Sequence, residues 1–297
     1  MKIGIVCTPR REGEAQLFRE LLSDKGLAVD LWRISPDWSF QIEQWLEKST
    51  HFMLLVEPEA YAAPWFQYLC GFSAGRGRPF LIVSEKELPR HLSHMPTAAS
   101  DSAVLEFWLK ASRLWKAAQI VEEAKAALER AELPFTRETF CRCVAEGELK
   151  AAELFFRAGM TGDVADARGV PALSLAVREA HRTLIAPLLA HGARIDAVSA
   201  DRGNTALMDA AANGDLETVQ NLIRAGADLN RSSKNAQTAL ILAVGKGSVD
   251  VAALLIEAGA DHSVADSLGM SAYAYAKLFK QQRILDLIDA GTGGGGV

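Results

Sequence analysis

The sequence has few cysteines, no excess of basic residues and no long apolar run. Its four cysteines form no Cys-x-x-Cys pair, and no His/Cys cluster has the spacing of a zinc site, so we expect free thiols and no metal. The 32 lysines and arginines are outnumbered by 37 aspartates and glutamates, which argues against nucleic acid or an anionic membrane as a partner. No segment reaches the roughly 18 apolar residues of a membrane-spanning helix.

The amino terminus also lacks the features of a secretion signal. Its apolar run is short, and Pro9, Arg10 and Arg11 follow that run instead of preceding it. We therefore expect a cytoplasmic location. The remaining composition is ordinary for a globular protein, with 49% hydrophobic and 23% charged residues, and 297 residues are enough for about two domains.

Glycines that follow apolar, helix-like runs recur at a nearly constant interval in the second half of the chain. Successive intervals are 33, 34, 33 and 32 residues, and the glycines are Gly159, Gly192, Gly226, Gly259 and Gly291. The tetrapeptide Ala-Gly-Ala-Asp also occurs twice, at 225–228 and 258–261. A period of about 33 residues with repeated phrases predicts a stack of helical repeats.

This half of the chain resembles the ankyrin repeat family, most specifically over about 166–266. Thr205 and Thr238 stand where the family has helix-capping hydroxyls, although the Pro and His that follow in the family's Thr-Pro-Leu-His motif are absent. The resemblance implies an all-α solenoid of five ankyrin repeats over 134–291, in which the first and last repeats act as caps. It also implies that another protein binds to the concave face of the solenoid.

The resemblance further indicates which side chains would contact that partner. In ankyrin proteins the turn tips and the outward side of the first helix of each repeat face the groove. The corresponding residues here are Arg168, Val170, Arg178, Arg202, Asn204, Asp209, Asn213, Asn235, Gln237, Lys246, Leu268 and Met270. They mix arginine, polar and apolar side chains, as interfaces between separately folded proteins do.

The first 100 residues alternate between short apolar runs and amphipathic segments, which predicts an α/β domain with a parallel sheet. Strands are expected at 2–7, 28–34, 51–56 and 80–84, with helices at 14–25, 40–48 and 61–75 between them. Ligands of such sheets bind beyond the carboxyl ends of the strands. The candidate ligand-pocket residues are therefore Thr8, Pro9, Glu57 and Trp65.

The segments 57–61 and 65–79 carry a further resemblance, to Toll/interleukin-1 receptor (TIR) domains, which have a flavodoxin-like parallel sheet. In TIR enzymes that cleave NAD, the catalytic carboxylate stands four residues after the tryptophan of this region. Counting from Trp65 reaches Leu69, which can neither hydrogen-bond a ribose hydroxyl nor stabilise positive charge. The resemblance thus implies a TIR-like fold without a catalytic residue and without a cofactor. Two alternatives stay open, an NAD hydrolase or nucleotide-processing enzyme that uses another carboxylate, and a small-nucleotide sensor without turnover.

Residues 101–133 predict a helical connection, because 101–132 contain neither glycine nor proline and are rich in strong helix formers. An apolar stripe that includes Trp108 and Trp115 should pack on the first domain; as an alternative, it could form a dimer interface. The final residues, 292–297, read as a flexible glycine-rich tail. The sequence as a whole predicts a bacterial interaction or scaffold protein with a second docking or regulatory module at its amino terminus.

Overall fold

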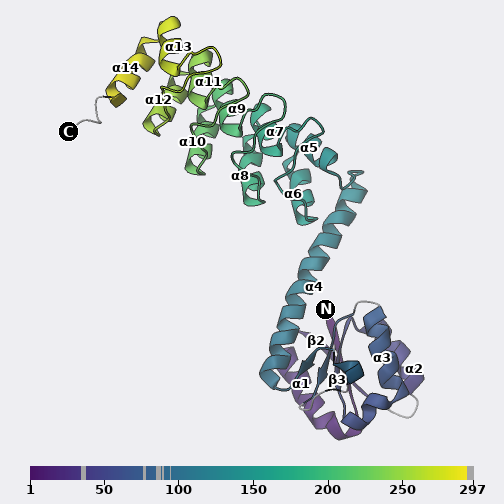
Figure 1. Ribbon diagram of the computed structural model, residues 1–297. Helices are drawn as coiled ribbons and strands as arrows, with labels where there is room; N and C mark the ends of the chain where they lie inside the picture. The colour runs from purple at the N-terminus through teal and green to yellow at the C-terminus, as the bar shows by residue number, and fades with distance from the viewer. Residues whose placement is uncertain (35–37, 76–77, 85–87, 89, 94, 293–297) are drawn as a thin grey trace, which may run out of the picture. The chain divides into compact units, whose positions relative to one another are not determined.

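A computed structural model describes residues 1–34, 38–75, 78–84, 88, 90–93 and 95–292. The chain divides into two compact units, residues 1–119 and residues 120–297 (Figure 1). Of the predicted tail, Thr292 is the last residue of the final helix, and 293–297 lie outside the described residues.

The first unit contains a parallel sheet with helices, as the alternating pattern predicted. The strands are β1 (Lys2–Cys7), β2 (Ala28–Arg33), β3 (His51–Leu55), β4 (Phe80–Val83) and β5 (Thr97–Ala98). Every neighbouring pair is parallel, and the order across the sheet is β2-β1-β3-β4-β5. The sequence did not predict β5, because a strand of two residues is too short to show any periodicity.

Helices cover both faces of this sheet (Figure 1). α1 (Glu12–Asp24) and the first part of α4 (Asp101–Arg130) pack on one face, and α2 (Trp38–Lys48) and α3 (Pro64–Gly75) pack on the other. The short 3₁₀ segments η1 (Pro9–Arg11), η2 (Pro58–Ala62) and η3 (Arg90–Leu92) lie in the connections. Because both faces are covered, β1 and β3 are apolar at every position after their first residues, Lys2 and His51, instead of alternating.

Gly4 in β1 makes room for an aromatic side chain. A Cβ atom at this position would lie 2.0 Å from the ring of Trp32 on the neighbouring strand. The Trp32 ring in turn stacks on Trp45 of α2, with ring centroids 5.3 Å apart. The glycine therefore serves close packing, a role that the strand pattern alone does not reveal.

α4 is a single helix that contributes to two cores. Val104 and Trp108 belong to the core of the first unit, and Ala124 and Leu128 belong to the core of the second. The Trp108 indole donates a hydrogen bond to the Met53 sulfur at 3.3 Å. The predicted packing of this stripe on the first domain thus holds for Trp108, which is fully buried and is not available to a second copy of the chain.

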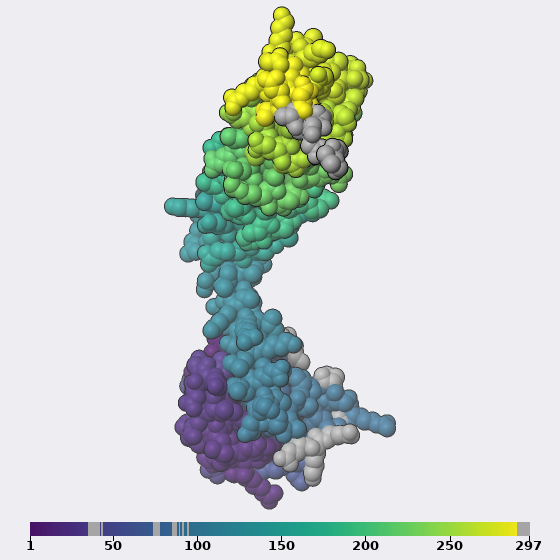
Figure 2. All heavy atoms as spheres, turned by 90° about the vertical axis from the view of Figure 1, so that its left-hand side faces the viewer, coloured from purple at the N-terminus to yellow at the C-terminus, as the bar shows by residue number. Residues whose placement is uncertain are grey.

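The second unit is all-helical, as the 33-residue period predicted. Its described residues form five helix pairs that follow one another in sequence order, which Figure 2 shows as a steady colour gradient along the unit. The pairs are α5 (Arg137–Ala145) with α6 (Leu149–Arg157), α7 (Ala172–Arg178) with α8 (Arg182–Ala190), α9 (Ala206–Asn213) with α10 (Leu216–Arg224), α11 (Ala239–Lys246) with α12 (Val249–Glu257), and α13 (Ala272–Leu278) with α14 (Gln282–Thr292).

Local chemistry explains where the first helices of the pairs begin and end. The side chains of Thr205 and Thr238 accept hydrogen bonds from the backbone N–H groups of Met208 and Ile241, both at 3.3 Å, so they cap α9 and α11. Gly214, with φ of 73°, ends α9 in the left-handed conformation that glycine adopts without strain. The sequence signals for helix ends were therefore sufficient here.

Backbone hydrogen bonds between successive turn tips tie the repeats together. Ala200 N–H donates to Gly169 C=O at 2.9 Å, and Ser267 N–H donates to Asn235 C=O at 2.9 Å. Near the helices, the Gln281 side chain donates to Val244 C=O at 2.9 Å. These bonds link neighbouring repeats without the histidine that the Thr-Ala-Leu segments lack.

Candidate functional site

The first helices of the last four pairs place equivalent residues at equal steps along the stack. They begin at Ala172, Ala206, Ala239 and Ala272. We call the fourth, seventh and eighth residues counted from these starts the inner-helix row. It consists of Leu175, Arg178, Glu179, Asp209, Ala212, Asn213, Leu242, Gly245, Lys246, Tyr275, Leu278 and Phe279.

A groove of about 300 Å³ lies where three consecutive helix pairs contribute to this row. Its lining residues are Ala212, Gln237, Ile241, Leu242, Gly245, Lys246, Tyr275 and Phe279. Most of these side chains are apolar, whereas Gln237 and Lys246 supply polar groups. Such a lining suits an apolar group that also carries a polar or charged atom.

Two aromatic side chains form one wall of the groove. The Tyr275 hydroxyl donates a hydrogen bond to the Asp266 carboxylate at 2.8 Å, which holds the ring in place. Phe279 stacks on that ring, with centroids 5.8 Å apart, and 49% of its surface stays exposed. An exposed aromatic side chain on a fixed neighbour is a preorganised apolar contact site.

A second groove of about 270 Å³ lies near the beginning of the stack and has more charged residues in its lining. Its lining residues are Glu138, Cys141, Arg142, Ala145, Asp166, Ala167, Arg168 and Leu175. The Arg168 guanidinium pairs with the Asp166 carboxylate at 2.9 Å, and Arg142 lies 4.0 Å from Glu146. Both arginines of this lining thus have a carboxylate partner within the chain.

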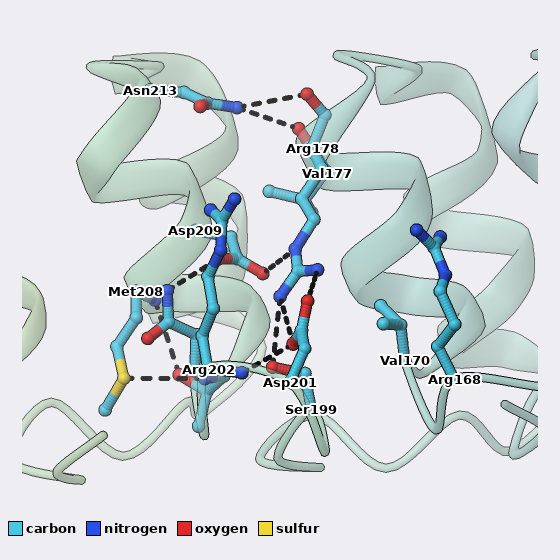
Figure 3. Close-up of polar contacts among 12 residues, drawn as sticks. Arg168, Val170, Val177, Arg178, Ser199, Asp201, Arg202, Met208, Asp209 and Asn213 are labelled. Atoms are coloured by element: carbon cyan, nitrogen blue, oxygen red, sulfur yellow. Dashed lines mark hydrogen bonds and ion pairs between the residues drawn. The ribbon is translucent and has the colours of Figure 1, made fainter. Parts of the chain in front are cut away.

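Arg178 lies at the centre of a hydrogen-bonded network between the second and third repeats (Figure 3). Its guanidinium donates to Asp209 and to Asp201, both at 2.7 Å, and to the Ser199 hydroxyl at 3.0 Å. The hydrogen bond from Arg178 holds the pKa of Asp201 well below its usual range. The Asn204 side chain donates to the other Asp209 oxygen at 2.7 Å, so Asp209 is paired on both sides.

This network corrects part of the predicted contact set. Val170, Asn204 and Asp209 are buried, at 0%, 7% and 2% exposure, and they cannot contact a partner on this surface. Val170 packs in the core, while Asn204 and Asp209 are used by the Arg178 network. Asn213 is exposed but donates to the backbone carbonyls of Val177 and Arg178.

The other predicted contact residues lie at or near the surface. Gln237 and Met270 are half-buried, and the exposed ones are Arg168, Arg202, Asn235, Lys246 and Leu268. Of these, Gln237 and Lys246 line the groove of the last three repeats. The prediction omitted Leu242, Gly245, Tyr275 and Phe279, although adding 33 residues to Asp209 leads directly to Leu242 and then to Tyr275. The signal was present in the repeat period, but the prediction did not carry the position of Asp209 forward into the next two repeats.

The predicted ligand pocket of the first unit is brought together in part. The Thr8 hydroxyl donates to the Glu57 carboxylate at 2.5 Å, beyond the ends of β1 and β3, and the other Glu57 oxygen is buried without a partner. Pro9 is exposed beside them. Trp65, however, is only 7% exposed because it packs edge-on against Phe66 in the core, so it does not line a pocket.

A third groove, of about 410 Å³, lies at the other end of the strands from Thr8 and Glu57, where β3 and β4 begin. Its lining residues are His51, Pro79, Phe107, Lys110, Ala111, Leu114, Trp115 and Ala118. Leu114 is 64% exposed and is therefore accessible to a second copy of the chain. A dimer through α4 stays a prediction, and measuring the molar mass of the protein in solution would test it. His51 itself is buried between Trp108 and Trp115, whose ring centroids lie 5.8 and 5.2 Å away.

The four cysteines are buried and unpaired, and burial raises the pKa of the Cys70 thiol to about 12. Within the described residues, no group of three or more His, Cys, Asp or Glu side chains is placed to hold a metal ion. In the same part of the chain, no helix combines the length and apolar character needed to cross a membrane.

Comparison with known proteins identifies what the second unit is similar to. A family model described as ankyrin repeats (3 copies) matches residues 140–233 and 207–291, which together span just over half of the chain. A protein of Treponema pallidum (strain Nichols), named as ankyrin repeat-containing, is 31% identical over 296 residues. That match covers 97% of this chain and 99% of the relative, so the similarity extends through the first unit as well.

Proposed function

Because the chain belongs to the ankyrin repeat proteins, a family that suggests a role in protein–protein interaction, we propose that it binds a protein partner with the exposed residues of its inner-helix row. The observation that carries this proposal is the groove of the last three repeats. In its wall, Phe279 directly follows α13 and is half-exposed, whereas Ala272 and Ala276 of α13 are buried. Exposed apolar side chains that line a groove are typical of interaction sites.

The chain offers a matched pair of variants for testing this face. Phe279 and Leu216 are apolar residues with 49% and 43% exposure, and Leu216 begins α10, a second helix of its pair. We expect Phe279→Ser to lose most of the proteins that the full chain captures from extracts of its source cells, whereas Leu216→Ser retains them. Quantitative mass spectrometry of the captured proteins measures this, with far-UV circular dichroism as the control for folding. Equal capture by both variants would place the binding surface elsewhere.

We further propose that the first unit is a flavodoxin-like or TIR-like docking or regulatory module. The strand order β2-β1-β3-β4-β5 supports this, because it is the order of flavodoxin-like doubly wound sheets. Leu69 is fully buried in an apolar core, so this position presents no catalytic group, which supports a docking or regulatory role for the unit over catalysis. The variant Glu59→Arg, in the exposed segment after β3, tests this second surface. Captured proteins that Glu59→Arg loses and Phe279→Ser keeps would bind at this segment. If Glu59→Arg loses none of the captured proteins, docking at this segment is refuted.

A further inference from the structure

The groove of the last three repeats also indicates the chemistry of its partner. Resting on the proposed function, we propose that this groove binds an acidic peptide segment that carries a bulky apolar side chain. The apolar side chain occupies the space over Gly245, against Leu242 and the aromatic rings of Tyr275 and Phe279. A carboxylate of the same segment pairs with Lys246.

Gly245 indicates where the apolar side chain enters. It lies inside α11, and a glycine inside a helix costs about 0.5–1 kcal/mol relative to alanine. The fold has no need of it, since its φ is not positive and an added Cβ would have no neighbouring atom within 4 Å. What the glycine does provide is an open floor at which another chain can approach the helix backbone closely.

The walls of this space are apolar and already positioned. Leu242 is half-buried, and the rings of Tyr275 and Phe279 stack with an interplanar angle of 21°. The hydrogen bond from Tyr275 to Asp266 orders the rings before any partner arrives, which lowers the entropic cost of binding. An aromatic or large aliphatic side chain fits these walls better than a polar one.

The charge of the groove distinguishes it from the rest of the chain. The full sequence has a formal charge of −5, yet segments 234–249 and 267–285 contain no carboxylate. Their cationic residues are Lys234, Lys246, Lys277, Lys280 and Arg283. An acidic partner is therefore attracted to this part of the solenoid.

Lys246 is the cation that the groove itself presents. It is exposed, lines the groove and forms no ion pair within the described residues. The carboxylate that contacts the lining, that of Asp266, is already engaged by the Tyr275 hydroxyl and by the N–H groups of Leu268 and Met270. In the second repeat, by contrast, Arg168 and Arg178 pair with carboxylates of the chain itself, so neither has an uncompensated charge to offer to a partner.

Selection from a random peptide library on the full-length protein tests this inference. Gly245→Leu, which fills the space from an open position, serves for counter-selection, and circular dichroism confirms that it is folded. We expect the enriched peptides to combine an aromatic or large aliphatic residue with aspartate or glutamate. Gly245→Leu should weaken their binding at least tenfold, and Gly245→Ala should weaken it less.

A charge exchange then tests the role of Lys246. Lys246→Glu should raise the Kd of an acidic peptide about tenfold, and a peptide with lysine in place of the acidic residue should regain the loss. Lys150→Glu, an exposed lysine on the second helix α6, should change the Kd less than twofold. Enrichment of basic peptides, or no enrichment that depends on Gly245, would overturn the inference. The proposed function is tested independently by the capture experiment: it is refuted if Phe279→Ser captures the same proteins as the unchanged chain.

Discussion

Replacing Leu207 or Leu240 by alanine lowers the free energy of unfolding of the second unit by about 2–5 kcal/mol. Both side chains are buried, at 1% and 0% exposure, in the first helices of the third and fourth repeats. Each truncation removes apolar contacts and leaves a cavity that close-packed neighbours fill only partly. Because each repeat is stabilised by its neighbours, a substitution in the middle of the stack weakens the interfaces with the repeats on both sides.

The positions of the tryptophans allow the unfolding of the two units to be followed separately. All six tryptophans lie in residues 1–119, so tryptophan fluorescence reports the first unit, while far-UV circular dichroism also follows the helices of the second. The control is Leu268→Ala at a turn tip, where the side chain is 80% exposed and the expected change is within about 0.5 kcal/mol. Equal unfolding midpoints for all three variants would show that the assigned repeat register is wrong.

The stability of the first unit rises with pH between about 4 and 6.5, and His51 is the reason. Burial, with smaller contributions from the positive charges of the amino terminus and Arg78, lowers the pKa of this side chain from 6.5 to about 4. Between these values the unfolded chain binds a proton that the folded chain does not, so acid favours unfolding. His51 therefore removes about 3 kcal/mol of stability as the pH falls through this window.

The surroundings of His51 explain why the folded chain keeps the ring neutral. The side chain is 1% exposed, between the edges of two tryptophan rings, and its Nδ1 lies 2.8 Å from the Thr50 hydroxyl. Urea unfolding followed by tryptophan fluorescence at pH 4.5, 5.5 and 7 measures the effect. His51→Gln, which cannot titrate, should show a flatter dependence on pH. If the variant and the unchanged protein have the same slope, another group is responsible.

Most of the second unit could be predicted from the sequence because its signals are local. Capping by Thr205 and helix termination by Gly214 depend on residues within one turn of the chain, and the repeat period brings each signal back about 33 residues later. The strands of the first unit were equally visible, since a strand covered on both faces is an uninterrupted apolar run. Strand β5 escaped detection because two residues contain no pattern.

The candidate contact surface was predictable only in part. The residues were chosen by their position at turn tips and on the first helices, and Asn204 and Asp209 satisfy that criterion while being buried in the Arg178 network. In the opposite sense, Tyr275 and Phe279 were not predicted as contact residues, yet the structure places both in the wall of the groove. Polarity along the chain does not reveal which polar groups find partners in a neighbouring repeat.

The sequence by itself determined the repeat period, the family, the parallel sheet of the first unit and the helix that follows it. Each of these depends on periodicity and on residue types whose conformational preferences act over a few positions. Only the tertiary structure decided that Gly4 makes room for Trp32, that Arg178 joins two repeats and that Lys246 lines a largely apolar groove. These facts depend on distances between segments far apart in the chain, because side chains are buried or left free by the neighbours that folding brings to them.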